Sequence, residues 1–371
     1  MSRRYAVVAG GGTAGHALPA LSVARALAER GVDPGSIELV GSRRGPEGPL
    51  LGDQGFPLTL LPGRGFSRRR RPADLWANVL AGLGLGAALL SAVADLARWR
   101  PRVVVSVGGY ASFAPAAAAI ALRVPLVLVN TDAVPGLVHQ VLGRFSAAAA
   151  VAFPGTPLPR AQVTGTPVRE EIRSVDRRDD ARASAKRQLG VPPGRRLLGA
   201  FGGSLGARRI NQAVAGLAER WSARDDLAIH HVVGRRDWDG DAGSDGAGAL
   251  SYRRVPFEDR MELVYQAADL VVCRAGALSV AELAVAGVPS VLVPLPGAPG
   301  DHQTRNAEAL VGAGAAILVP DGRCSTDELA SVAGGLLDDP AHLAAMGRAA
   351  RTLGHPDAAE KVAEVVAANA R

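Results

Sequence analysis

Short apolar runs alternate with longer stretches rich in alanine and leucine along the whole chain. The runs have the length of strands, and the stretches between them have the length and composition of helices. The clearest strand-like runs are residues 103–107, 125–129, 229–233, 270–273, 290–293 and 316–319. Because regular alternation of strands and helices is typical of a parallel sheet covered by helices, the pattern predicts the α/β fold class.

Two of the apolar runs end in glycine-rich turns that open helix-like stretches. Residues 6–9 lead into Gly10-Gly11-Gly12-Thr13-Ala14-Gly15-His16, and residues 197–201 lead into Gly202-Gly203-Ser204-Leu205-Gly206-Ala207. Glycine allows a tight bend and close approach of a ligand. A helix that begins there directs free N–H groups and the positive end of its dipole at a phosphate. One such unit in each half predicts two facing nucleotide-binding folds and an enzyme that joins two substrates.

The domain boundary is expected where the strand–helix alternation is interrupted. Residues 174–187 are highly charged, and Pro192-Pro193-Gly194 restarts the chain before the next strand. We therefore predict an N-terminal domain over residues 1–168 and a C-terminal domain over residues 169–355. The last helix-like segment, within residues 356–371, is expected to complete the first domain.

Composition excludes some classes of function. The 371 residues suffice for two or three domains, and the net charge of +7 comes almost entirely from arginine. The basic residues are not interleaved with aromatic residues, and no nucleic-acid-reading motif is present, so no nucleic-acid partner is expected. Cys273 and Cys324 have neither metal-ligand spacing nor the number for a disulfide framework, which fits a reducing cytosol. The N-terminal apolar run is too short for a signal peptide.

One segment has the composition of a membrane-surface helix. Arginines precede the uncharged run 75–94, which begins with Leu75 and Trp76 but also contains Asn78 and three glycines. A membrane-spanning helix needs about 20 predominantly apolar residues, and this run is a weak candidate. A helix lying in the interface beside basic residues is one interpretation, and a core helix with a solvated arginine loop is the other. The basic cluster consists of Arg64, Arg68, Arg69, Arg70 and Arg71.

Several polar residues have both a chemical and a structural interpretation. His16 could act as a general base near neutral pH or begin a helix. Ser204 could bind a phosphate, although its glycine turn could equally serve close helix–strand packing. Glu282 could accept hydrogen bonds from two ribose hydroxyls, but Ser279-Val280-Ala281-Glu282 also matches a capping box, which the residues alone favour. From spacing alone, Gly108-Gly109-Tyr110 is a simple turn.

Two further clusters follow strands of the second half. Asp237, Asp239 and Asp241 alternate in a loop, but the later ligand positions of a calcium loop are missing, so a solvated turn is expected and no metal site. His302, Gln303, Arg305 and Asn306 follow a loop rich in proline and glycine. They suit the hydroxyls of a sugar or, alternatively, begin a helix at residues 306–311.

Taken together, these motifs resemble the MurG family, the N-acetylglucosaminyltransferases that convert lipid I to lipid II in bacterial peptidoglycan synthesis. The resemblance covers nearly the whole chain in the right order, and the block from Cys273 to Ala307 is the most specific. It implies a GT-B fold, in which two Rossmann-like domains with parallel sheets face each other across a cleft. The segments that carry it are residues 10–16, 108–110, 165–169, 202–207, 273–277, Glu282 and 303–307.

The resemblance implies that the second domain binds the donor UDP-N-acetylglucosamine. Glu282 would hold the ribose, which reverses the preference for a helix cap, Ser204 would bind the pyrophosphate, and Phe257 would border the uracil. His302 stands where some members have a second glutamine. The other donor contacts that the resemblance implies are Thr13, Gly15, Arg169, Gly203, Leu205, Ala277, Leu278 and Gln303.

The resemblance also implies an undecaprenyl-linked acceptor, such as lipid I, on the first domain. An acceptor hydroxyl would attack the anomeric carbon with inversion, His16 is the candidate base, and neither a cofactor nor a metal is needed. The enzyme would rest peripherally on the cytoplasmic face of the cell membrane, an anionic surface, through Arg68, Arg69, Arg70, Arg71, Leu75 and Trp76. The implied acceptor contacts are Gly12, Ala14, Gly108, Gly109, Tyr110 and Asp132.

One departure from the family concerns the acceptor side. The family usually carries His-Glu-Gln-Asn where this chain has Val129-Asn130-Thr131-Asp132. A MurG-like paralogue that glycosylates another polyprenyl-linked or secondary-metabolite acceptor is therefore the alternative function. A non-catalytic UDP-sugar-binding membrane scaffold is an alternative of another class, and a UDP-sugar epimerase of the same fold is a third.

Overall fold

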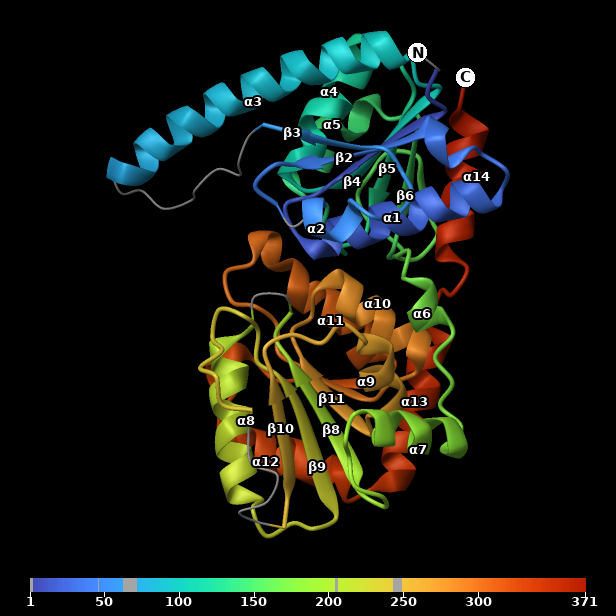
Figure 1. Ribbon diagram of the computed structural model, residues 1–371. Coiled ribbons are helices and arrows are strands. Elements are labelled where there is room, and N and C mark those ends of the chain that lie inside the picture. The colour runs from blue at the N-terminus through green and yellow to red at the C-terminus, as the bar shows by residue number, and fades with distance from the viewer. Residues whose placement is uncertain (1–2, 46, 63–71, 204–205, 243–248) are drawn as a thin grey trace. The chain divides into compact units, whose positions relative to one another are not determined.

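The chain forms two α/β units. The computed structural model describes residues 3–45, 47–62, 72–203, 206–242 and 249–371, with residues 72–80 described by their backbone (Figure 1). Unit 1 comprises Met1–Arg169 and Pro356–Arg371, and unit 2 comprises Glu170–His355. The chain therefore leaves unit 1 once and returns to it with its last helix.

Unit 1 contains a parallel sheet whose described strands follow the order β3-β2-β1-β4-β5-β6-β7. The order reverses direction between β1 and β4, and ligands of such sheets bind beyond the carboxyl ends of the strands at that point. The strands are β1 (Ala6–Gly10), β2 (Ile37–Ser42), β3 (Leu58–Leu61), β4 (Val103–Gly108), β5 (Leu126–Asn130), β6 (Ala148–Val151) and β7 (Ala161–Val163).

Helices cover both faces of this sheet because successive strand side chains point to opposite faces. Ala6 and Val8 of β1 face a core shared with α1 and α14, whereas Val7 and Ala9 face a core shared with α3 and α4. The last helix, α14, lies beside α1 (Figure 1). The helical segments are α1 (Ala14–Glu29), η1 (Pro34–Ser36), α2 (Glu47–Leu51), α3 (Pro72–Trp99), η2 (Tyr110–Ser112), α4 (Phe113–Ala121), α5 (Leu137–Leu142), η3 (Gly143–Phe145) and α14 (Ala358–Asn369).

Unit 2 repeats the same plan with a parallel sheet in the order β10-β9-β8-β11-β12-β13. Here the order reverses between β8 and β11, which places the expected ligand site after these two strands. The strands are β8 (Arg196–Phe201), β9 (Leu227–Val232), β10 (Ser251–Val255), β11 (Leu270–Cys273), β12 (Ser290–Leu292) and β13 (Ala316–Leu318).

The core of unit 2 also has two layers of helices. Leu198 packs with α8 and α12 on one face of the sheet, and the neighbouring Leu197 packs with α7 and α9 on the other. The helical segments are α6 (Glu170–Arg173), α7 (Asp179–Gln188), α8 (Arg208–Arg220), α9 (Met261–Ala267), α10 (Ala277–Ala286), η4 (Pro299–Asp301), α11 (His302–Gly312), η5 (Asp321–Arg323), α12 (Thr326–Leu337) and α13 (Pro340–Thr352). The predicted class, two α/β units built on parallel sheets, is confirmed.

Candidate functional site

The glycine turns after β1 and β4 of unit 1 pack directly against each other. A Cβ atom on Gly109 would lie 2.0 Å from the Gly11 carbonyl oxygen, and one on Gly12 would lie 2.7 Å from the Tyr110 ring. Gly12 and Gly109 also have φ angles of 95° and 76°, in the left-handed region that favours glycine. The glycines at 108 and 109 therefore do more than form a local turn, because they also allow close packing against the first glycine turn.

A buried carboxylate that the sequence did not reveal supports the first turn. The Gly12 N–H donates to Glu47 Oε1, and the Glu47 side chain at the start of α2 is fully buried. The Gly12 N–H is thus used inside unit 1, so a ligand contact of Gly12 would have to use another atom. No local pattern around Glu47 marks it, because its partner lies 35 residues earlier in the chain.

His16 lies in the first turn of α1 with its ring against the turn after β4. Its Cδ2 and Cε1 atoms approach within 2.9 and 3.3 Å of where Cβ atoms of Gly109 and Gly108 would stand. Neither glycine could therefore carry a side chain without displacing the His16 ring. The structure brings together the predicted base and the second glycine turn of unit 1.

A second histidine, His139 of α5, approaches Gly108 from a different element. Its Cε1 lies 3.6 Å from the position of a Gly108 Cβ atom. Its Nδ1 lies 3.2 Å from Asn130 Oδ1, and its Nε2 lies 3.2 Å from both the hydroxyl and the carbonyl oxygen of Ser106. Burial, followed by the nearby charge of His16, lowers the pKa of His139 to about 4. His139 is therefore neutral near pH 7.

The loop after β5, where the chain departs from the family, is anchored to this histidine. Asn130 Nδ2 donates to the Asp132 carbonyl oxygen at 2.6 Å while Asn130 Oδ1 faces His139. Asn130 and Thr131 are buried, whereas Asp132 is half-buried. Sequence reasoning identified Asp132 but missed His139, whose role depends on a hydrogen bond between α5 and the end of β5.

In unit 2, the glycine turn after β8 combines packing with an open backbone. A Cβ atom on Gly202 would lie 2.2 Å from the Ala207 nitrogen, and one on Gly206 would lie 2.2 Å from the Val233 carbonyl oxygen. Gly203 has a φ of 87°, and among the described residues no heavy atom stands within 4 Å of its Cβ position. The packing interpretation thus applies to Gly202 and Gly206, while Gly203 is open to a ligand. Ser204 and Leu205 lie outside the described residues.

Glu282 lies inside α10, and the capping-box interpretation is wrong. The N-cap of α10 is Gly276, three residues before Ser279, so Ser279 is a residue of the helix and not its cap. Glu282 is only 5% exposed, and its Oε2 accepts a hydrogen bond from the Tyr265 hydroxyl at 2.9 Å. Burial, and then the negative charge of Glu282, raises the pKa of the Cys273 thiol, which therefore stays protonated.

The start of α10 presents backbone N–H groups at the end of β11. The N-cap residue Gly276 has no side chain to bond the N–H groups of the first turn, which includes Ala277 and Leu278, so these groups can receive an anion or a hydroxyl. The preceding loop is held by Asn306 Nδ2, which donates to the Ala275 carbonyl oxygen at 3.2 Å. Arg274 in the same loop pairs with Asp321 at 2.7 Å.

His302 and Gln303 begin α11, four residues earlier than the helix start predicted at residue 306. The Leu295 N–H donates to Gln303 Oε1 at 2.9 Å, so the Gln303 side chain turns toward the loop after β12 and can offer its amide NH₂ as a donor. His302 Nδ1 donates to the Pro299 carbonyl oxygen at 2.9 Å. Both side chains are partly exposed and lie near the carboxyl end of β12.

Further residues that the sequence singled out lie in loops or at the end of a chain segment. Phe257 follows β10, is 36% exposed, and has the Arg235 guanidinium 4.7 Å from the centre of its ring. Arg169 is half-buried at the end of the first segment of unit 1. Asp239 and Asp241 pair with Arg254 at 3.0 and 2.8 Å. Within the described part of the chain, no group of three metal-ligating side chains is present.

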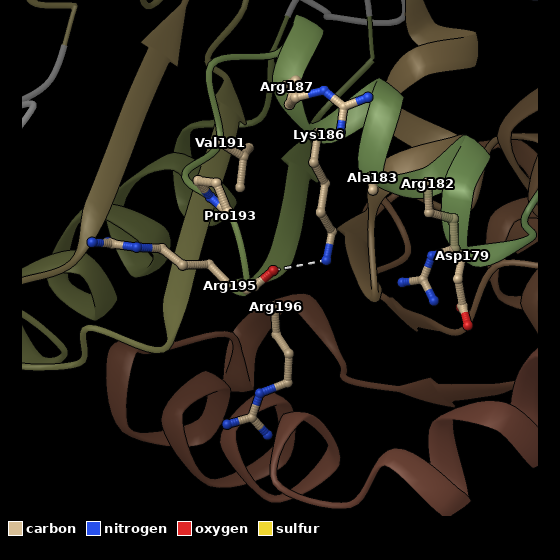
Figure 2. Close-up of a pocket in the computed structure, with 10 residues that line it drawn as sticks. Asp179, Arg182, Ala183, Lys186, Arg187, Val191, Pro193, Arg195 and Arg196 are labelled. Carbon is tan, nitrogen blue, oxygen red and sulfur yellow. Dashed lines mark hydrogen bonds between the residues drawn. The ribbon is translucent and has the colours of Figure 1, made fainter.

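A basic cavity of about 290 Å³ in unit 2 lies away from these residues, at the amino end of β8. Figure 2 shows that the guanidinium groups of Arg187, Arg195 and Arg196 point away from one another. Lys186 Nζ is occupied by the Arg195 carbonyl oxygen and by Asp269, at 2.7 and 2.8 Å. Because its cationic groups diverge or are already paired, this cavity does not form a converging anion site.

Comparison with known proteins covers both units. The glycosyltransferase family 28 N-terminal domain matches residues 6–151, and the family 28 C-terminal domain matches residues 198–362. A relative from Nocardioides sp. is 41% identical over 361 residues, which cover 97% of this chain and 96% of the relative. A relative from Desulforudis audaxviator is 37% identical, with 97% of each chain covered.

Both relatives are named UDP-N-acetylglucosamine--N-acetylmuramyl-(pentapeptide) pyrophosphoryl-undecaprenol N-acetylglucosamine transferase. Among solved structures, MurG of Acinetobacter baumannii superposes with a TM-score of 0.75 and 28% identity, covering 99% of this chain and all of that one. The fold class and the enzyme class that the sequence predicted are thereby confirmed. With both units matched by family models and relatives aligned over nearly the whole chain, the chain belongs to the MurG family of N-acetylglucosaminyltransferases, within glycosyltransferase family 28.

Proposed function

We propose that this chain transfers N-acetylglucosamine from UDP-N-acetylglucosamine to the muramyl 4-hydroxyl of lipid I, forming lipid II in peptidoglycan synthesis. The observation that carries the proposal is the near full-length match to relatives named for this transfer. The geometry agrees with it, because Gly203 and Glu282 follow the adjacent strands β8 and β11. A parallel sheet binds its nucleotide at this position.

The donor would be bound by unit 2. The buried Glu282 carboxylate accepts from the ribose hydroxyls, and the Gly203 backbone, with Ser204 and Leu205, receives the pyrophosphate. Phe257, whose ring is partly exposed, borders the uracil. The first turn of α10, at Ala277 and Leu278, and the NH₂ group of Gln303 are directed at the sugar, with His302 beside it. The hydrogen bonds from the ribose hydroxyls to the Glu282 carboxylate would be charge-assisted, and such bonds are stronger than neutral ones.

The acceptor would be bound by unit 1, with its diphosphate near the glycine turns around Gly12, Ala14, Gly108, Gly109 and Tyr110. His16 removes the proton of the attacking hydroxyl as the new bond to the anomeric carbon forms. The bond from that carbon to the β-phosphate oxygen breaks, and UDP leaves with its charge stabilised by glycine amides and a helix N-terminus. Attack opposite the leaving group turns the α-linked donor into a β-glycoside. Thr13, Gly15 and Arg169 are proposed as further donor contacts.

The direct test is transfer of radiolabelled N-acetylglucosamine from the UDP-sugar to lipid I by the purified full chain. Labelled lipid II is the expected product. A chain that binds UDP and labels another polyprenyl-linked acceptor, but not lipid I, would indicate the paralogue. A chain that binds UDP and labels no acceptor would indicate the non-catalytic scaffold.

Membrane attachment is proposed to be peripheral, on the cytoplasmic face. In the described residues, the stretch Ala81–Trp99 of α3 is long and apolar enough to cross a membrane, with a mean hydropathy of 1.3, but only 22% of it is buried. Leu83 and Leu90, seven residues apart on α3, are 68% and 74% exposed, which argues against a core helix. Leu75 and Trp76 lie in α3 where the backbone alone is described, and Arg68, Arg69, Arg70 and Arg71 lie outside the described residues.

We expect binding to vesicles that contain anionic lipid to weaken as salt rises, because electrostatic reach shrinks from about 8 Å at physiological ionic strength. The double variant Leu83→Ser/Leu90→Ser should bind these vesicles more weakly than the unaltered chain at the same salt concentration, since it removes apolar contact with the interface. Co-sedimentation measures both effects, with Leu353→Ser, an exposed leucine of unit 2, as the matched control. Protein that stays in the membrane through high salt and alkaline washing would show a true span instead.

Acceptor preference is proposed to depend on Asp132. A carboxylate only accepts hydrogen bonds and repels a diphosphate, whereas asparagine can donate. Restoring all of His-Glu-Gln-Asn would place a histidine at Val129, which is 1% exposed in the core, so the single change Asp132→Asn is the cleaner test. We expect kcat/KM for lipid I to rise several-fold with no change in the donor KM.

Steady-state kinetics with lipid I measure this effect. Asp53→Asn removes an equal charge from an exposed position of unit 1 and should change nothing. Equal kcat/KM values for the Asp132→Asn variant and the unaltered chain would show that Asp132 does not oppose the acceptor.

A further inference from the structure

Tyr265 is a fully enclosed tyrosine whose hydroxyl is directed at the proposed ribose-binding carboxylate. It lies on α9, is 1% exposed, and donates to Glu282 Oε2 at 2.9 Å. Its partner belongs to a different helix, α10, and is itself 5% exposed. A hydroxyl buried this deeply needs a partner, and here it has a charged one.

The Tyr265 ring also contacts the strand that leads into the glycine turn of unit 2. Phe201, the last residue of β8, meets it edge to face, with ring centres 6.0 Å apart and planes at 83°. The backbone of Tyr265 is fixed too, because the Arg177 guanidinium donates to its carbonyl oxygen. Tyr265 is therefore held from three sides, and it connects Glu282 with the strand that ends at Gly202 and Gly203.

We propose that Tyr265 is a positioning residue for the donor: its hydroxyl fixes the orientation of the Glu282 carboxylate so that this group accepts from the two ribose hydroxyls. The proposal rests on the ribose role proposed above for Glu282. Tyr265 itself touches no substrate in this scheme, and it acts through the carboxylate.

The physical reason is the freedom of a glutamate side chain. The last torsion of glutamate is broad and roughly two-fold, so an untethered carboxylate samples many orientations. A hydrogen bond to one oxygen selects one of them before the nucleotide arrives, which lowers the ordering cost of binding. A carboxylate has about four lone-pair sites, so accepting from Tyr265 leaves capacity for a ribose diol.

The test compares two ligands, UDP and 2′,3′-dideoxy-UDP, which lacks both ribose hydroxyls. Calorimetric titration gives the ratio of their dissociation constants, which measures recognition of the ribose hydroxyls alone. In the unaltered chain we expect UDP to bind more tightly than the dideoxy compound by about 100-fold or more, because two hydrogen bonds to a charged group are lost without the ribose hydroxyls. Tyr265→Phe removes one hydroxyl group and keeps the ring against Phe201.

Tyr265→Phe should reduce that ratio about 10-fold by weakening UDP binding and leaving dideoxy-UDP binding unchanged. Equal weakening of both ligands would mean that Tyr265 only supports the fold, and an unchanged ratio would mean that it does not position Glu282. Either result overturns the proposal. Tyr252→Phe is the matched control, since its hydroxyl contacts His231 Nδ1 at 3.0 Å and not Glu282, and it should leave the ratio unchanged.

Glu282→Ala separates this proposal from the one on which it rests. If Glu282→Ala abolishes ribose discrimination while Tyr265→Phe retains it, Glu282 binds ribose without help from Tyr265. If Glu282→Ala itself retains discrimination, the ribose role fails and the positioning role falls with it. Thermal unfolding of each variant shows that the fold persists.

Discussion

Replacing Glu282 with alanine is expected to weaken binding of UDP-N-acetylglucosamine about 100-fold or more. Two charge-assisted hydrogen bonds to ribose hydroxyls would be lost, each contributing about 1.5–3 kcal/mol. A donor KM raised by this factor, or transfer too slow to measure, is the expected kinetic result, and the UDP dissociation constant is the direct measurement. Because Glu282 is not part of a helix cap, loss of capping cannot account for such a change.

Ser279→Ala is the control for the capping-box interpretation. The box would have required the Ser279 hydroxyl at the helix start, and its loss would then cost about 0.5–2 kcal/mol of stability. Since Ser279 lies within α10, we expect the midpoint of thermal unfolding to stay the same. Normal UDP affinity in Glu282→Ala would disprove the donor role of this carboxylate.

Replacing His16 with glutamine is expected to lower kcat about 10²- to 10⁴-fold, which is the usual contribution of a general base. Glutamine keeps a polar side chain against Gly108 and Gly109 but cannot accept a proton at neutral pH. The UDP dissociation constant should not change, because the proposed role of His16 lies in the chemical step. Single-turnover transfer to lipid I isolates that step.

The pH profile of kcat provides the second measurement. A protonated imidazole cannot accept the proton of the attacking hydroxyl, so if His16 is the base, the acidic limb of the kcat profile should vanish in His16→Gln. His139, whose ring also approaches Gly108, cannot produce a limb near neutral pH, because burial holds its pKa at about 4. A variant that keeps normal kcat and the same acidic limb would show that the base is another residue.

The sequence by itself determined the features that depend on local pattern. Apolar runs of strand length separated by helical stretches predicted two parallel α/β units, and β11 (Leu270–Cys273) lies where the pattern placed it. The glycine turns after β1 and β8 were also readable, since a left-handed φ at Gly12 or Gly203 excludes most other residues. Both features follow from the chain within a few residues.

Only the tertiary structure decided which side chains meet at the ends of the strands. Gly12 pairs with Glu47, His139 with Asn130, and Tyr265 with Glu282, each across two elements that the strand order brings together. These contacts leave no periodic signal in the sequence, because each requires only one residue at one place.

The capping box is a case in which a local sequence pattern predicted the wrong role for a residue. The pattern from Ser279 to Glu282 fits the motif, yet α10 begins at Ala277 because Gly276 is extended and Asn306 holds the loop before it. A helix start is chosen by the backbone that precedes it, and here a distant helix fixes that backbone. The Glu282 carboxylate therefore does not cap the helix and is buried beside Tyr265 instead. The residues next to Glu282 in the sequence do not indicate this contact.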